Sequence, residues 1–147
     1  MVSNTKIICN TALIKVDHII YMQRAYYAVE TDAPTGDAGQ SVAVNHHNCR
    51  FGQWYDTGDG QEQYSHLPIY PSIIEPHSQV HSNVHKVMDI LGQNWRHDKS
   101  LQLKIIDYLD QSEKASAELI VLLDTLADEK KHFESVSADT VGEVDLF

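Results

Sequence analysis

Three histidines recur at intervals of four between residues 75 and 85, at His77, His81 and His85. On an α-helix, residues four apart lie one above the other on a single face, so these imidazoles would form a ladder. Two imidazoles one turn apart are spaced to share one zinc ion. The same spacing also occurs on polar, solvated helix faces, and the ladder alone does not decide between the two interpretations.

A second group of chemically notable residues lies upstream, where Cys49 precedes Gly52 and Trp54. The pattern predicts a turn followed by a short helix over about residues 49–55, with Asn48 as its cap. A cysteine in the first turn of a helix experiences positive potential, which favours the thiolate, the form that binds zinc. Free cysteines are also common as small buried hydrophobic residues, and this is the competing interpretation.

The elements that would position these residues are helices. Apolar residues at intervals of three and four predict a first helix over residues 4–30, a histidine-bearing helix that ends near residue 93, and a last helix over about residues 99–133. Glycine and proline predict a loop at residues 31–41. The sequence therefore predicts an all-α fold, an antiparallel four-helix bundle with a short extra helix carrying the cysteine.

Length and composition limit the classes of function. The 147 residues predict one domain over residues 1–133, followed by an acidic, flexible tail over residues 134–147. The net charge of −10 argues against partners such as nucleic acid or anionic membrane. Two cysteines provide no disulfide framework, which favours a reduced, cytoplasmic protein.

Ligands for one ion can be assembled from three of these elements. His18 lies on an apolar stripe of the first helix and is expected to point inward, although an isolated inward histidine is commonly a hydrogen-bonded core residue. Three imidazoles and one thiolate suit tetrahedral Zn²⁺; the candidate metal ligands are His18, Cys49, His77 and His81, with His81 and His85 as a competing pair.

Several expectations follow from this ligand set. Asp17 and Glu75 are candidate partners for the ring N–H groups of the histidines. Unperturbed pKa values predict a zinc affinity that falls steeply below about pH 6. A catalytic zinc keeps an open position for water, and four protein ligands leave none, so the sequence predicts that the protein is not an enzyme.

The chain resembles the chemoreceptor zinc-binding (CZB) domain family in four segments, residues 16–18, 46–55, 76–77 and 80–81. The second segment is the most specific, because it carries the family order of cysteine, basic residue, hydrophobic residue, glycine, any residue and tryptophan. The resemblance implies a four-helix bundle, a homodimer and one zinc per protomer, held by His18, Cys49, His77 and His81. It also favours His77 over His85. His46 and His47 lie near the proposed site as well, and we expect them to orient Cys49 or the loop rather than to bind metal.

The resemblance further implies a regulatory or sensory domain of bacterial signal transduction. Zinc occupancy or oxidation of Cys49 would be the signal, in response to zinc level or hypochlorous acid, and chemotaxis or cyclic-di-GMP control would be the output. Its partner would be a signalling protein or an attached signalling domain. The alternative function is a structural zinc-stabilised bundle that acts as a protein-interaction module, with residues 145–147 as its candidate docking segment.

Overall fold

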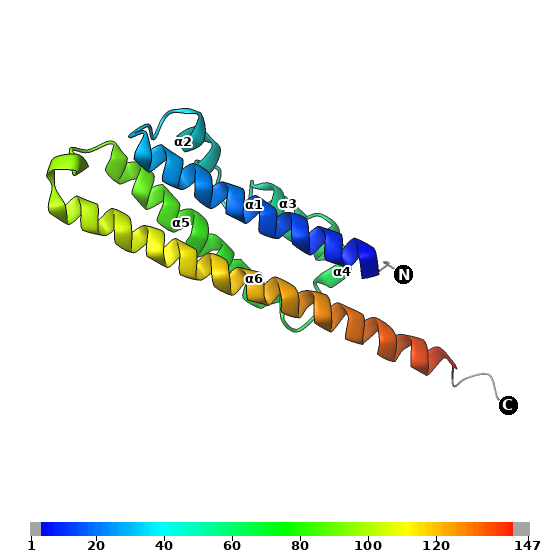
Figure 1. The fold of residues 1–147 in the computed structure, drawn as a ribbon. Helices are drawn as coiled ribbons and strands as arrows, with labels where there is room; N and C mark the ends of the chain where they lie inside the picture. The colour runs from blue at the N-terminus through cyan, green and yellow to red at the C-terminus, as the bar shows by residue number, and fades with distance from the viewer. Residues whose placement is uncertain (1–3, 143–147) are drawn as a thin grey trace.

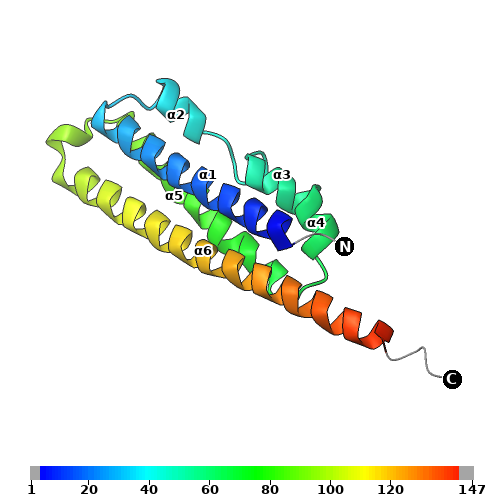
Figure 2. The same cartoon turned by 45° about the vertical axis from the view of Figure 1, so that its right-hand side comes forward.

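The computed structural model describes residues 4–142, which are largely helical and contain no strand. The three long helices lie side by side (Figures 1 and 2): α1 (Asn4–Glu30), α5 (Ile74–Leu91) and α6 (Lys99–Gly142). Shorter elements fill the connections, namely α2 (Asp37–Val42), α3 (Arg50–Asp56), α4 (Asp59–Tyr64) and the 3-10 helices η1 (Tyr70–Ile73) and η2 (Trp95–His97). The all-α prediction is confirmed.

The path of the chain brings a broken segment alongside the long helices. Helices α1 and α5 run in the same direction and α6 runs opposite to both (Figure 1). The chain returns from the end of α1 to the start of α5 through α2, α3 and α4, which follow one another along this path (Figure 2). Because the return segment is interrupted at residues 43–49, it places an irregular loop beside the middle of α1 and α5.

Local signals explain where the long helices begin and end. Asp98 caps α6, because its Oδ1 accepts hydrogen bonds from the main-chain N–H groups of Ser100 (2.8 Å) and Leu101 (3.2 Å). Pro76 lies in the first turn of α5, where a missing N–H breaks no helical hydrogen bond. Gly92 ends the same helix as its C-cap.

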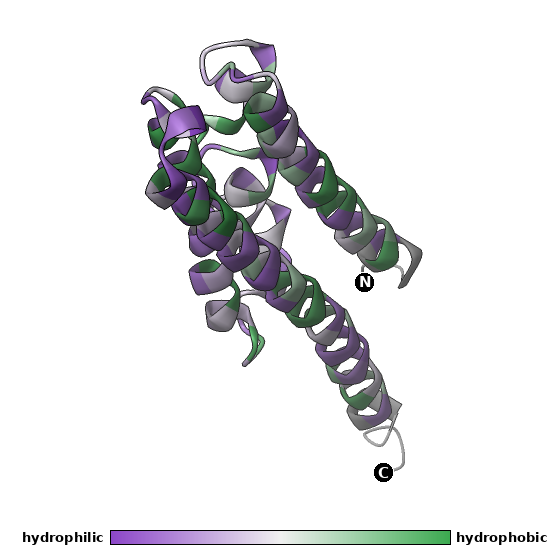
Figure 3. Cartoon of the chain, turned by 60° about the vertical axis from the view of Figure 1, so that its left-hand side comes forward, coloured by the Kyte–Doolittle hydropathy of each residue, from purple (hydrophilic) through white to green (hydrophobic). Residues whose placement is uncertain are grey.

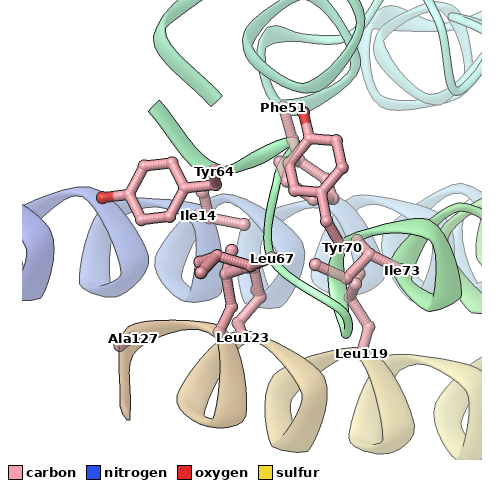
Figure 4. Close-up of a cluster of buried hydrophobic side chains, with 10 residues drawn as sticks. Ile14, Phe51, Tyr64, Leu67, Tyr70, Ile73, Leu119, Leu123 and Ala127 are labelled. Carbon is pink, nitrogen blue, oxygen red and sulfur yellow. The ribbon is translucent and has the colours of Figure 1, made fainter. Parts of the chain in front are cut away.

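The core is a row of three hydrophobic clusters between the helices. Figure 4 shows the first, formed by α1, the segment from α3 to η1, and α6; it contains Ile14, Phe51, Tyr64, Leu67, Tyr70, Ile73, Leu119, Leu123, Leu126 and Ala127. The second cluster contains Met22, Ala25, Val42, Val80, Val84 and Ala115. The third contains Ala28, Val87, Ile90, Leu91, Ile105 and Leu109.

Buried histidines occupy the boundary between the first two clusters. On α1, His18 lies between Ile14 and Met22, one turn from each, and is itself buried. On α5, His77 follows Ile73 of the first cluster and precedes the second. An imidazole thus interrupts the apolar stripe of each helix at the same level of the bundle. Because these rings are buried in the core, their nitrogen atoms need polar partners there.

Two boundaries differ from those expected. Residues 31–41 are not all loop, because α2 begins at Asp37; Gly39 makes this possible, since a Cβ there would lie 2.0 Å from the carbonyl oxygen of Pro34. The last helix extends to Gly142 rather than about residue 133, because residues 93–141 contain no glycine or proline to end it earlier. The tail expected from residue 134 is therefore helical as far as residue 142, and residues 145–147 lie outside the described part.

None of the helices within residues 4–142 combines the length and the apolar character that crossing a bilayer requires.

Candidate metal centre

Cys49 occupies the N-cap of α3, directly before the helix begins at Arg50. The sequence placed it in the first turn after an Asn48 cap, and this was wrong by one residue. The main-chain N–H of Gly52 donates to Cys49 Sγ at 3.2 Å, so sulfur takes the role that a side-chain oxygen usually has. The thiol in turn lies 3.5 Å from the carbonyl oxygen of His46, to which it donates.

A tight turn before α3 fixes the position of Cys49. The side-chain oxygen of Asn45 accepts hydrogen bonds from the main-chain N–H groups of His47 and Asn48, each at 3.0 Å. The N–H of Cys49 donates to the carbonyl of Asn45 at 3.1 Å. Asparagine is well suited to such turns because its side chain mimics a backbone carbonyl. The helix therefore begins after the turn is complete.

His77 and His81 bring two imidazoles to the sulfur from α5. They are 1% and 3% exposed, and His77 Nε2 lies 3.3 Å from Cys49 Sγ. The ligand atoms of Cys49, His77 and His81 all lie within 4.8 Å of one another, and no other such trio occurs among the described residues. Ligand atoms around a tetrahedral zinc are roughly 3.3–3.8 Å apart, so this group fits one zinc ion after a small contraction.

Main-chain carbonyls orient His81 and its neighbour His85. His81 Nδ1 donates to the carbonyl of Val44 at 2.8 Å, which leaves the lone pair on Nε2 free to bind a metal. His85 Nε2 lies 2.9 Å from the carbonyl of Val42 and 3.2 Å from that of Val44. The structure thus groups His81 with His77, while His85 holds the loop from the next turn of α5.

His18 approaches this group from α1. It is 4% exposed, and its ring centroid lies 5.4 Å from that of His77. It does not belong to the compact trio of ligand atoms. Its Nδ1 is buried without a hydrogen-bond partner in the described part of the chain. An unpaired buried nitrogen is costly, and a metal ion beside it would supply the missing partner.

Comparison with known proteins agrees with this geometry. The family model described as the chemoreceptor zinc-binding domain matches residues 18–88. Over residues 18–88 the chain is therefore similar to the CZB family. No curated protein and no solved structure matches the chain. CZB domains form a regulatory zinc-binding family, so zinc is the cofactor that the grouped Cys49, His77 and His81 are positioned to hold.

Burial determines the protonation of the candidate metal site. Desolvation lowers the pKa of His77 to about 2, with further lowering by the neighbouring imidazoles, and lowers the pKa values of His18 and His81 to about 4. Burial also raises the pKa of Cys49 and outweighs the main-chain N–H groups at the start of α3. The expected thiolate is therefore not favoured in the metal-free site; the thiol loses its proton when zinc binds.

Asp17 and Glu75, the two carboxylates expected to orient the ligand histidines, have other partners. Asp17 accepts hydrogen bonds from the guanidinium of Arg50, with Arg50 Nε 2.8 Å from its Oδ2. Glu75 accepts a hydrogen bond from Gln79 Nε2 at 2.8 Å. The prediction that these carboxylates orient imidazoles was wrong. Asp17 instead ties α1 to the start of α3, and a backbone carbonyl, which no side-chain pattern reveals, orients His81.

The glycine of the family pattern has a steric reason in this chain. A Cβ at Gly52 would lie 1.8 Å from the carbonyl oxygen of His46. We expect Gly52→Ala to lower the free energy of unfolding of the zinc-free protein by about 1–3 kcal/mol, measured by urea denaturation. The control is Gly92→Ala, whose Cβ would lie 3.6 Å from its nearest neighbour, the carbonyl of Asp89. Equal losses in both variants would contradict this explanation.

Proposed function

We propose that this chain is a zinc-dependent regulatory domain of bacterial signal transduction, with one zinc bound by Cys49, His77, His81 and His18. The observation that carries the proposal is the 3.3 Å approach of Cys49 Sγ to His77 Nε2, with His81 in the same group. The unpartnered Nδ1 of His18 supports its place as the fourth ligand. The donor set matches zinc, which favours nitrogen and sulfur in a tetrahedral arrangement.

This ligand set would join three parts of the chain. His18 belongs to α1, Cys49 to the loop before α3, and His77 and His81 to α5. When bound, zinc supplies the charge that stabilises the thiolate and pairs with the buried imidazole nitrogens. Without zinc, these nitrogens lack that partner at a boundary between hydrophobic clusters, so α1 and the loop have reason to repack. Zinc occupancy can thereby change the surface offered to a partner.

Oxidation of Cys49 would release a ligand from the same site. A solvent-open cavity of about 290 Å³ is lined by Cys49, His18 and His81 among others, so a small oxidant can reach the sulfur. With hypochlorous acid, the thiolate takes up the OH group and chloride leaves, which converts the thiolate to a neutral sulfenic acid. The sulfenic acid is a weaker zinc ligand than the thiolate. Zinc level and hypochlorous acid are the two candidate signals.

We place the domain in the cytoplasm, acting on a signalling protein or an attached signalling domain in chemotaxis or cyclic-di-GMP control. Two free cysteines and a net charge of −10 support this setting and a partner other than nucleic acid. Because four protein ligands close the coordination sphere, we propose regulation rather than catalysis.

The architecture that fits this function is a four-helix bundle. Helix α1, the broken return segment, α5 and α6 alternate in direction along the chain, as up-down-up-down bundles do (Figure 1). The return segment would serve as the fourth member, with α3 as the short helix that carries Cys49. Because the return segment is interrupted, it contains a loop whose main-chain carbonyl groups and thiol face the histidines of α5, which a continuous helix would not provide.

Exposed apolar side chains on α1 support the homodimer that the family resemblance implies. Ile8, Val16 and Ile19 are 53%, 50% and 53% exposed, and Figure 3 shows hydrophobic residues recurring along this helix. A second copy would cover them. We expect wild-type protein to have twice the chain mass of 16.6 kDa by light scattering, and Ile19→Glu to shift it to monomer. Gln93→Glu adds the same charge elsewhere and should leave the dimer intact; a monomeric wild type would overturn the proposal.

Removal of zinc separates regulation from the structural alternative. Because the three hydrophobic clusters extend along the bundle without relying on a metal, we expect the chelated protein to keep its far-ultraviolet circular dichroism. Amide chemical shifts should change around residues 18, 43–49 and 77–81. Loss of helical signal on chelation would instead identify the zinc as structural, as in small zinc-dependent folds, and would favour the interaction-module alternative.

A further inference from the structure

Two imidazoles beside the metal centre have no role in the ligand set. His46 and His47 lie on the loop before Cys49, in the turn made by Asn45. The His47 side chain is 58% exposed, His46 is half-buried, and His77 is 1% exposed. Exposure therefore decreases along this series of imidazoles, from solvent to the proposed site.

The rings are close enough to form a continuous series. The centroids of His47 and His46 are 4.0 Å apart, and His46 lies 5.8 Å from His77 and 6.5 Å from His81. The two proposed ligands His77 and His81 are themselves 5.0 Å apart by the same measure. Each step along the series is thus comparable to the separation of the two proposed ligands.

A carboxylate prepares the outermost ring for a metal. His47 Nδ1 lies 2.7 Å from Asp56 Oδ2, so the ring N–H points at the carboxylate and Nε2 keeps its lone pair. The same arrangement of carboxylate, histidine and metal orients ligands in many zinc sites. Asp56 also places negative charge at the exposed end of the series, which attracts a divalent cation. The close approach of Gly52 to the backbone of both histidines holds this loop in place.

We propose that His47 and His46 form the path by which zinc enters and leaves the site. The proposal rests on the zinc site described above. His47 Nε2 would replace one water of an incoming hydrated ion, the His46 ring would replace a second water, and His77 and His81 would then receive the ion. In release the same exchanges would occur in reverse, with water replacing each imidazole.

A path residue and a ligand differ in their effects on rate and affinity. A residue that binds the ion only in passage changes loading and release by the same factor and leaves the dissociation constant unchanged. A ligand of the bound ion changes the dissociation constant, mainly through faster release. Measuring both rates and the affinity therefore distinguishes transfer from ligation and from a merely structural effect on the loop.

The test uses full-length protein and zinc alone, with a chromophoric chelator to follow release in the range where its rate no longer depends on chelator concentration. We expect His46→Ala and His47→Ala to slow both loading and release by about tenfold, with the dissociation constant changed less than about threefold. Asp56→Asn keeps both imidazoles and should slow both rates by a smaller factor. His97→Ala removes an exposed histidine outside the site and should match wild type.

Unchanged rates in both histidine variants would overturn the transfer path. So would release that accelerates in proportion to a loss of affinity, since that result makes His46 or His47 a ligand of the bound ion. Zinc content of the wild type, measured separately by mass spectrometry, tests the proposed function itself. If the wild type binds zinc and the variants load and release it at the wild-type rates, only the transfer path is contradicted. If the wild type binds no zinc, the transfer path and the proposed function are both contradicted.

Discussion

Replacing Cys49 with alanine is expected to weaken zinc binding about 100-fold. A small structural zinc site has a binding free energy of roughly 10–16 kcal/mol, so one of four ligands contributes about 3 kcal/mol. Cys49 is the only sulfur in the group and lies 3.3 Å from His77 Nε2, so no neighbouring group replaces it without moving. The affinity is measured by competition with a chelator of known zinc affinity.

Cys9→Ala is the matched control for this experiment. Cys9 is exposed on α1 and lies outside the group of ligand atoms, so its removal should leave the zinc affinity unchanged. The variant also removes any contribution from adventitious zinc bound to an exposed thiol. If Cys49→Ala and Cys9→Ala bind zinc equally well, Cys49 is not a ligand, and the redox part of the proposed function has no basis.

Acid is expected to destabilise the zinc-free protein by several kcal/mol between pH 7 and pH 4. Folding lowers the pKa of His77 from 6.5 to about 2 and those of His18 and His81 from 6.5 to about 4. The unfolded chain therefore binds protons near pH 6.5 that the folded chain does not bind. The contribution of these neutral rings to the free energy of unfolding is therefore fully present above pH 6.5. It is lost as the pH falls from 6.5 toward the lower pKa values of the folded protein.

Urea denaturation of chelated protein at pH 7, 5.5 and 4.5 measures this effect. Replacing His18 with leucine removes one of the three groups and should reduce the slope of stability against pH, whereas His97→Ala, an exposed histidine, should not. A free energy of unfolding that stays constant from pH 7 to pH 4.5 would mean that the three rings are solvated. That result would contradict a buried histidine site.

The same pKa values change the expected pH dependence of zinc binding. Unperturbed histidines predicted a steep loss of affinity below about pH 6, because three rings and a thiol would all compete with zinc. In the folded site the rings stay neutral to about pH 4, and the thiol of Cys49, whose pKa is raised, supplies the competing proton. One released proton predicts a tenfold loss of affinity per pH unit, until acid unfolding of the zinc-free protein adds to it.

Helical periodicity explains why much of the site was visible in the sequence. His18 shares its stripe with Ile14 and Met22, and all three are buried as predicted. His77 and His81 are one turn apart, and helix geometry alone brings them together. These relationships depend on residues within a few positions of one another, so local spacing predicts them well.

The remaining features depend on contacts between distant segments. The carbonyl of Val44 orients His81, a residue 37 positions away, and a backbone group carries no sequence signal. The turn at Asn45 moves the start of α3 by one residue, and the fit of Gly39 against Pro34 allows α2 to form. The protonation of Cys49 and the histidines follows from burial, which the residue types by themselves do not specify.

The most direct test of the zinc site is zinc K-edge X-ray absorption of the zinc-loaded protein. We predict one zinc per chain with one sulfur at about 2.3 Å and three imidazole nitrogens at about 2.0–2.1 Å, and a first shell without sulfur in Cys49→Ala. A wild-type spectrum with only nitrogen and oxygen neighbours would contradict coordination by Cys49, His77, His81 and His18.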